Sequence, residues 1–262
     1  MKQCGKNRGL AGGLWKPGAG FSLVELLAVM AIIAVLSCLL LPGFSRAGDK
    51  GRRLACQNNL KQLVTSVQMY AADNQGKLPQ NSPGEESNRT WVPGNMRLAQ
   101  DSTNLLLIKE GCLYPYANHT GTVHCPSDLS TMNGLLRVRS YSMNGWIGSR
   151  YMQDVSPQTS FRTFVRDSEL AAAGPANLWL ILDEHEASID DSWFLVTMDD
   201  SRPFASFPAN RHSRGYSLNF ADGHVELYRL TDPQSQRLGT DEVRISPHNS
   251  DWVRMKQVTT TH

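Results

Sequence analysis

Residues 21–41 form an apolar stretch whose only charged side chain is Glu25, and this stretch limits what the rest of the chain can fold into. Its length matches the ~20 residues that an α-helix needs to cross a bilayer. A secretory signal peptide cleaved after Ala47 is the alternative, but its apolar core would be shorter, about 7–15 residues, and would not carry an acid near its start. The pattern therefore favours a retained transmembrane helix over residues 21–44.

The residues before this stretch are basic. Lys2, Lys6, Arg8 and Lys16 precede Phe21, and no acidic residue does. They are four of the 26 basic residues, against 24 acidic ones, so a chain that begins at Phe21 keeps 22 basic residues and has a formal charge of −2. A slightly acidic protein offers no electrostatic reason to bind nucleic acid. We therefore expect membrane and protein partners and no nucleic acid.

The segment 20–27 reads GFSLVELL and resembles the prepilin cleavage motif of type IV pilins and type II secretion pseudopilins. The resemblance implies a leader over residues 1–20, cleavage by a prepilin peptidase between Gly20 and Phe21, and N-methylation of Phe21. It also implies a single-pass inner-membrane protein with a cytoplasmic N-terminus and a periplasmic C-terminal domain, which reaches the pilus or cell surface if it assembles.

Glu25 is the candidate assembly residue. A carboxylate one turn inside a membrane helix is costly and calls for a partner. In the family this glutamate pairs with the freed N-terminal amine of a neighbouring subunit, so the resemblance implies that Glu25 pairs with Phe21 of another copy. The alternative is that Glu25 only extends to the nearby lipid headgroups.

Beyond the apolar stretch, residues 45–75 predict an amphipathic helix. Its apolar positions recur at spacings of three and four, as expected for one helical face: Leu54, Leu60, Leu63, Val64, Val67 and Tyr70. Residues 76–262 predict a periplasmic or extracellular globular domain. Its strand candidates are Ser140 to Asn144, Leu178 to Leu182, Trp193 to Thr197, Tyr216 to Phe220 and Val225 to Leu230. The expected fold is α+β, a pilin-like long helix packed on an antiparallel sheet.

His212 and, after nine intervening residues, the pair Asp222-Gly223 resemble the H-X9-DG signature of pseudopilin-like families from planctomycetes and verrucomicrobia. Asp-Gly favours a tight hairpin turn. We expect His212 to fix this turn by a hydrogen bond across the sheet. A catalytic or metal-binding pair of His212 and Asp222 is the alternative.

Two further sites follow from the loops and from the family. Asp183, Asp190, Asp191 and Asp222 are hard oxygen ligands of the kind that Ca²⁺ takes, and major pseudopilins carry a calcium site in C-terminal loops. The segment that begins at Cys56 resembles the corresponding family segment, which implies a disulfide between Cys56 and Cys125.

A zinc set made of Cys112, His119, His124 and Cys125 is a further alternative for these thiols.

The sequence therefore predicts a pilin-like structural subunit, a pseudopilin, that associates with other pilin-like subunits in a type II secretion or type IV pilus-like machine. The alternative is a membrane-anchored binding or adhesin-like minor subunit, with Trp91, Trp146 and Trp193 in an exposed groove. No nucleophile elbow, phosphate loop or zincin helix occurs, so we expect no enzyme, with a hydrolase based on His212 as the weakest alternative.

Overall fold

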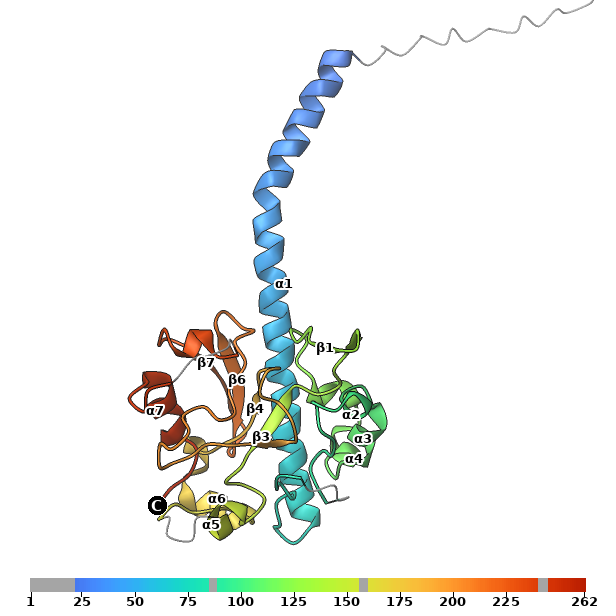
Figure 1. Cartoon of the computed structure of the whole chain (residues 1–262). Helices are drawn as coiled ribbons and strands as arrows, with labels where there is room; N and C mark the ends of the chain where they lie inside the picture. Colours follow the sequence, from blue (N-terminus) through green and yellow to red (C-terminus); the bar gives the residue numbers. More distant parts are fainter. Residues whose placement is uncertain (1–21, 85–88, 156–159, 240–244) are drawn as a thin grey trace, which may run out of the picture. The chain divides into compact units, whose positions relative to one another are not determined.

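The computed structural model describes residues 22–84, 89–155, 160–239 and 245–262, without the side chains of residues 39–46 inside the first helix. This helix, α1, runs from Leu23 to Asp73 (Figure 1). The chain divides into two units, Met1–Ala47 and Gly48–His262. Helix α1 contributes residues to both units.

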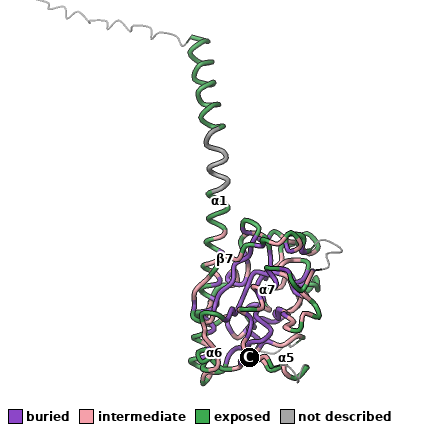
Figure 2. The backbone as a smooth tube through the Cα atoms, turned by 90° about the vertical axis from the view of Figure 1, so that its left-hand side faces the viewer, coloured by how far each residue is buried: buried purple, intermediate pink, exposed green. Residues whose placement is uncertain are grey.

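The N-terminal unit contains the first half of α1, whose described side chains are all exposed (Figure 2). They are apolar for the most part, and Leu23 is 73% exposed. The transmembrane helix predicted over residues 21–44 falls partly outside the described residues. Within the part of the chain that is described, no helix combines the length and the apolarity that crossing a membrane requires.

The second half of α1 forms one wall of the core of the globular unit. Its buried residues follow the spacing of a single helical face: Cys56, Leu60, Leu63, Val64, Val67 and Ala71. The predicted stripe is thus correct in its centre and wrong at its start, because Leu54 is 52% exposed and Cys56 takes the buried position. Tyr70 is only partly buried against the core.

A five-stranded sheet packs on α1, with the strand order β5-β3-β4-β6-β7. Its strands are β3 (Tyr141–Asn144), β4 (Trp179–Asp183), β5 (Trp193–Phe194), β6 (Gly215–Phe220) and β7 (Val225–Arg229). The pairs β3·β4, β4·β6 and β6·β7 are antiparallel, as predicted. The edge pair β3·β5 is parallel, and β5 is only two residues long, so the sheet is mixed where a purely antiparallel one was expected.

The two faces of the sheet have different neighbours. Tyr216, Leu218 and Phe220 of β6 lie in an apolar cluster with Trp252 and Met255. Those two residues belong to helix α7 (Ser250–Gln257). Residues between them on β6 point to the opposite face, because successive side chains of a strand alternate. The described part of the globular unit is therefore layered as α1, sheet and α7.

Short elements connect these layers. Before the sheet lie α2 (Ala99–Ser102), α3 (Leu105–Glu110), α4 (Tyr114–Ala117), η1 (Thr120–Val123), β1 (Thr131–Met132) and β2 (Leu135–Leu136). Between and after its strands lie α5 (Tyr151–Val155), α6 (Asp167–Ala173), η2 (Pro175–Asn177) and η3 (Ser235–Arg237). The two longest of these elements, α3 and α6, have six and seven residues, so irregular backbone makes up much of this unit.

Candidate functional site

The prepilin-like motif lies at the beginning of α1. Gly20 and Phe21 are outside the described residues. Ser22 and Glu25 make the reciprocal contacts of a helix cap: the Ser22 amide donates to Glu25 Oε2 at 2.9 Å, and the Val24 amide donates to Ser22 Oγ at 3.3 Å. This S-x-x-E pattern is visible in the sequence, although it was not predicted there. Glu25 is thus exposed and bound only to its own helix end in the described chain.

Four buried residues meet between α1 and the sheet, and we call them the buried tetrad: Cys56, Cys125, Asp183 and His212. Cys56 comes from α1, Cys125 from the loop after η1, Asp183 from the end of β4, and His212 from the loop before β6. One ligand atom from each lies within 4.8 Å of the other three. His212 Nε2 is 3.2 Å from Cys125 Sγ and 3.9 Å from Asp183 Oδ2. Both thiols are free, so the structure brings the predicted disulfide partners together without the bond.

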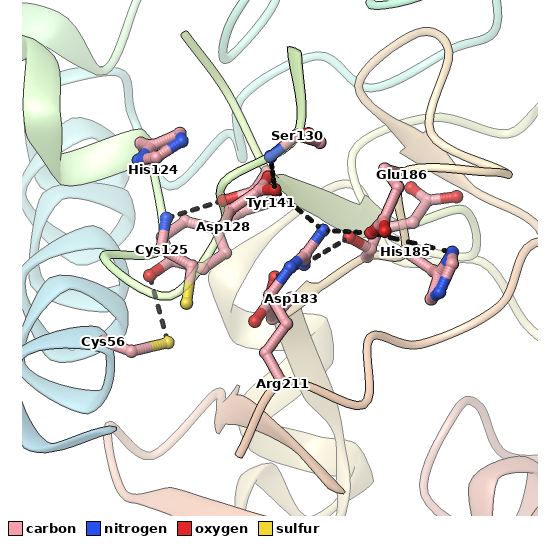
Figure 3. A network of polar contacts seen from close by, with 12 residues as sticks. Cys56, His124, Cys125, Asp128, Ser130, Tyr141, Asp183, His185, Glu186 and Arg211 are labelled. Atoms are coloured by element: carbon pink, nitrogen blue, oxygen red, sulfur yellow. Dashed lines mark hydrogen bonds and ion pairs between the residues drawn. The ribbon is translucent and has the colours of Figure 1, made fainter. Parts of the chain in front are cut away.

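Neighbouring side chains hold the tetrad in place (Figure 3). The Tyr141 hydroxyl donates to Cys56 Sγ at 3.1 Å, and the Cys125 amide donates to Ser140 Oγ at 2.6 Å. The Arg211 guanidinium bonds Asp183 Oδ1 at 2.5 Å. Asp183 Oδ2 is buried and has no hydrogen-bond partner among the described residues. Arg211 therefore holds Oδ1 of this carboxylate, and Oδ2 faces the other members of the tetrad.

Arg211 connects this site to two more acids. It lies 3.2 Å from Asp128 and 2.7 Å from Glu186, and it is almost completely buried with Asp128. Arg211 directly precedes His212 in the sequence, and no motif or spacing there predicts this network. Figure 3 shows Arg211 beside Asp183, with Glu186 further along the same network.

Burial and hydrogen bonds shift the pKa values of Cys56, Cys125 and Asp183 in the tetrad. The hydrogen bond from Cys125, helped by His212 and Tyr141, lowers the pKa of Cys56 to about 5, although burial opposes this. The same contact with Cys56, together with burial, raises the pKa of Cys125. Burial raises the pKa of Asp183 to about 7, although Arg211 opposes the shift. A thiolate at Cys56 beside the carboxyl group of Asp183 favours the binding of a cation.

The signature residues His212 and Asp222 lie at opposite ends of β6, which has six residues. An extended strand of this length spans about 20 Å. The expectation that His212 fixes the hairpin turn is therefore wrong, and the two residues do not form a catalytic pair. Asp222 instead caps the turn itself, accepting from the His224 amide at 3.0 Å, while Gly223 supplies a φ of 94°.

Between these ends, β6 and its turn are bonded to α1. Asn219 donates to the Leu60 carbonyl at 2.7 Å and accepts from the Ile181 amide at 2.8 Å, so it bridges α1 and β4. Lys61 donates to the Gly223 carbonyl at 2.6 Å. The segment from His212 to Gly223 thus contacts α1 along its length, which sequence spacing alone does not reveal.

The four acids predicted for calcium do not come together. Asp183 belongs to the tetrad, and Asp222 lies in the β6–β7 turn. Asp191 accepts from the amides of Trp193 and Gly84, and Asp190 accepts from the amide of Asp191, so both cap loops. Among the described residues, the tetrad is the group of three or more His, Cys, Asp and Glu side chains placed to hold a metal ion.

The zinc set considered from the sequence is not assembled either. Cys125 belongs to the tetrad, whereas Cys112 donates to the Arg89 carbonyl at 3.2 Å and His119 accepts from the Gly121 amide at 3.1 Å. Burial lowers the pKa of His124, which the described chain places beside Asp128 and Arg211. Only one member of the set is therefore in a position to bind a metal together with other ligands in the described chain.

Aromatic residues line a cavity of about 560 Å³ on the globular unit. Trp146 and Trp193 are among its walls and are largely buried, while Tyr151 at its edge is exposed. Tyr151 packs edge-on against Trp193, with ring centres 5.7 Å apart. Trp91 was predicted to share an exposed groove with these tryptophans, but it lies in the core against α1.

Known proteins resemble the N-terminal part of the chain. Residues 15–39 match the family described as "Prokaryotic N-terminal methylation motif". The "Competence protein ComGC" of Halalkalibacterium halodurans is 40% identical over 67 residues, which are 24% of this chain and 61% of that protein. The "ComG operon protein 3 homolog" of Bacillus licheniformis is 25% identical over 78 residues, which are 30% of this chain and 78% of that protein. No solved structure gives a significant match.

The match places Gly20, Phe21 and Glu25 inside a methylation motif. The chain spans about three fifths of the first of these relatives, and the similarity covers less than a third of the chain itself. The N-terminal segment of the chain is therefore similar to that of type IV pilin-like proteins of the prepilin type.

Proposed function

We propose that this chain is a pilin-like structural subunit of the pseudopilin kind. In this proposal a prepilin peptidase cleaves between Gly20 and Phe21 and methylates Phe21, and the segment 21–44 holds the subunit in the inner membrane. The globular unit then lies in the periplasm, and the subunit joins other pilin-like subunits in a type II secretion or type IV pilus-like machine. The name of the first relative adds a competence system to the machines that this subunit could join.

One observation carries the proposal: the methylation motif at residues 15–39 contains a lone carboxylate, Glu25, in an apolar helix. The same helix continues into a globular unit, where it supplies a buried face from Cys56 onward. A helix that is exposed and apolar in its first half has surface to bury against other helices or lipid. This arrangement suits a subunit that packs by its N-terminal half and presents its globular unit to the periplasm.

Glu25 has the chemistry for the assembly contact. Its carboxylate now accepts one hydrogen bond, from the Ser22 amide, and a carboxylate has room for about four. Cleavage before Phe21 creates a new amine at the end of the same helix. Glu25 is exposed and can accept further hydrogen bonds, so it can bind an amine from a neighbouring subunit. In an apolar environment such an ion pair is strongly favoured over an unpaired charge.

The first test is the N-terminus of the full chain recovered from membranes of cells that also express a prepilin peptidase. Intact mass and N-terminal sequencing are expected to show a chain that begins at methylated Phe21. A chain that keeps Met1, or begins near Gly48, contradicts the processing step.

The second test separates assembly from helix capping. We expect Glu25→Ala to be inserted and cleaved, but to lose the crosslinks between subunits that the native chain gives in membranes. Ser22→Ala is the matched control, because it removes the other half of the same cap and leaves the carboxylate. If both variants lose crosslinking equally, the contribution of Glu25 is local and the assembly role fails.

A binding or adhesin-like subunit is the second candidate, and the aromatic cavity favours it. A cavity of about 560 Å³ is within the range that holds small ligands. Ligand binding there would quench tryptophan fluorescence in a saturable way when a saccharide panel is titrated into the full chain. Tyr151→Ala, at the exposed edge, would weaken the effect, and a panel that gives no saturable quenching removes this candidate.

A further inference from the structure

The buried tetrad takes no part in the processing and assembly steps proposed above. Its four side chains carry two sulfurs, one imidazole nitrogen and one carboxylate oxygen into a space 4.8 Å across. In a tetrahedral zinc site, bonds of about 2.0–2.3 Å place the ligand atoms about 3.3–3.8 Å apart. The contacts of 3.2 Å and 3.9 Å that His212 Nε2 makes within the tetrad lie close to that range.

We propose that Cys56, Cys125, Asp183 and His212 bind one zinc ion in a closed, structural site. Two sulfurs with one imidazole in tetrahedral arrangement are typical of zinc, whereas calcium takes six to eight oxygen ligands. All four positions are filled by protein, and all four residues are buried. The site therefore has no place for a substrate, and its role is to hold α1 on the sheet.

The unpartnered oxygen of Asp183 is the independent observation that points to a cation. Asp183 Oδ2 is fully buried without a hydrogen bond, which costs free energy in a protein interior. Arg211 holds the other oxygen at 2.5 Å and thereby fixes the direction of the carboxylate. A carboxylate that is oriented in this way from outside is a common support for a metal ligand.

The second sphere suits thiolate ligands. The Tyr141 hydroxyl donates to Cys56 Sγ, and such a hydrogen bond stabilises negative charge on sulfur. Zinc binds both sulfurs as thiolates, so any proton that they still carry leaves as the ion enters.

A disulfide between Cys56 and Cys125 explains fewer of the contacts in the tetrad than a bound zinc ion does. It would use two of the four side chains and remove the thiol that contacts His212. It would also leave Asp183 Oδ2 without a partner. An ion satisfies all four groups at once, and we therefore assign the site to zinc and treat the disulfide as an outcome of the test.

The test uses the full chain, purified in detergent with a reductant and without chelators. Elemental analysis is expected to give one zinc per chain. Replacement by Co²⁺ is expected to give the intense visible bands of a tetrahedral ion and a sulfur-to-cobalt charge-transfer band. These spectra report sulfur ligation in the native chain and do not depend on any variant being folded.

The variants identify the ligands. Cys125→Ser and Asp183→Asn are expected to weaken zinc binding at least tenfold in a competition titration with a chromophoric chelator. Cys112→Ser is the matched control, because its thiol lies outside the tetrad, and it is expected to bind zinc like the native chain.

Three results would overturn the assignment. The first is a reduced chain that takes up neither Zn²⁺ nor Co²⁺. The second is a Cys56–Cys125 disulfide in peptides of the chain isolated without reductant. The third is an equal loss of zinc in Cys112→Ser and Cys125→Ser, which would mean that the thiols bind the ion without a defined site.

Discussion

Replacement of Asn219 by alanine is expected to loosen α1 from the sheet. Asn219 is completely buried, and its amide connects the Leu60 carbonyl at 2.7 Å with the Ile181 amide at 2.8 Å. The register of β4 against β6 shifts between Trp179 and Ile181, and at this irregularity the Asn219 side chain bonds the Ile181 amide. In Asn219→Ala this N–H is buried without a partner.

The expected cost follows from these two bonds. An unsatisfied buried amide costs about 1–3 kcal/mol. Loss of the hydrogen bond to the Leu60 carbonyl, which also accepts a hydrogen bond within α1, adds about 1 kcal/mol. We expect a loss of roughly 2–4 kcal/mol in the free energy of unfolding. For a unit of this size, that lowers the thermal midpoint by roughly 4–16 °C. Urea unfolding of the detergent-solubilised full chain, followed by tryptophan fluorescence, measures the change.

Ser217→Ala is the matched control. Ser217 lies two residues earlier on the same strand, so it points to the same face, and it is equally buried. Its hydroxyl has no hydrogen-bond partner in the described part of the chain, so its removal is expected to be neutral or stabilising. The reasoning is refuted if Asn219→Ala stays within about 0.5 kcal/mol of the native chain, or if Ser217→Ala loses as much stability.

Two further predictions concern the core and the acid stability of the globular unit. Leu60→Ala is expected to cost about 2–5 kcal/mol in urea unfolding because Leu60 is fully buried, whereas exposed Leu54→Ala is expected to stay within about 0.5 kcal/mol; equal losses would contradict the assigned helix face. Although burial opposes it, hydrogen bonds from Lys256 and Trp252 lower the pKa of Asp200. Its stabilising effect is therefore present above about pH 4 and is lost as the pH falls through its lowered pKa, so thermal midpoints of Asp200→Asn are expected to fall less on acidification than those of the native chain.

The fold could be predicted where local signals are strong. The end of α1 near Asp73, the hairpin through Asp222 and Gly223, and the five strands follow from periodicity and turn residues, although β5 is shorter than predicted. Leu54 was misplaced because it lies six residues before Leu60, which puts it about 120° away from Leu60 around the helix, whereas Cys56, four residues before Leu60, lies on the buried face. The parallel pairing of β5 with β3 depends on long connections that leave no local pattern.

The site illustrates a different limit. All four residues of the tetrad were singled out in the sequence, but in separate sets. Cys56 and Cys125 were predicted to form a disulfide, with Cys125 in a zinc set as the alternative. Asp183 was predicted for calcium, and His212 for the hairpin turn or for a pair with Asp222. Motif spacing reports neighbours along the chain, whereas a metal site needs neighbours in space. Arg211, which orients Asp183, could not be predicted as part of the site, because nothing in the sequence distinguishes a buried, paired arginine from an exposed one.

The contacts between α1 and β6 also set an order of events during synthesis. Leu60 and Asn219 are 159 positions apart, and Lys61 and Gly223 are 162 positions apart. The apolar face of α1 is among the first parts of the globular unit to leave the ribosome, and the strand that covers it is among the last. Pairing over such separations is slow, and bare apolar surface aggregates in the meantime. A truncated chain that stops before β6 therefore exposes this face, by which a chaperone or protease can distinguish an unfinished molecule from a complete one.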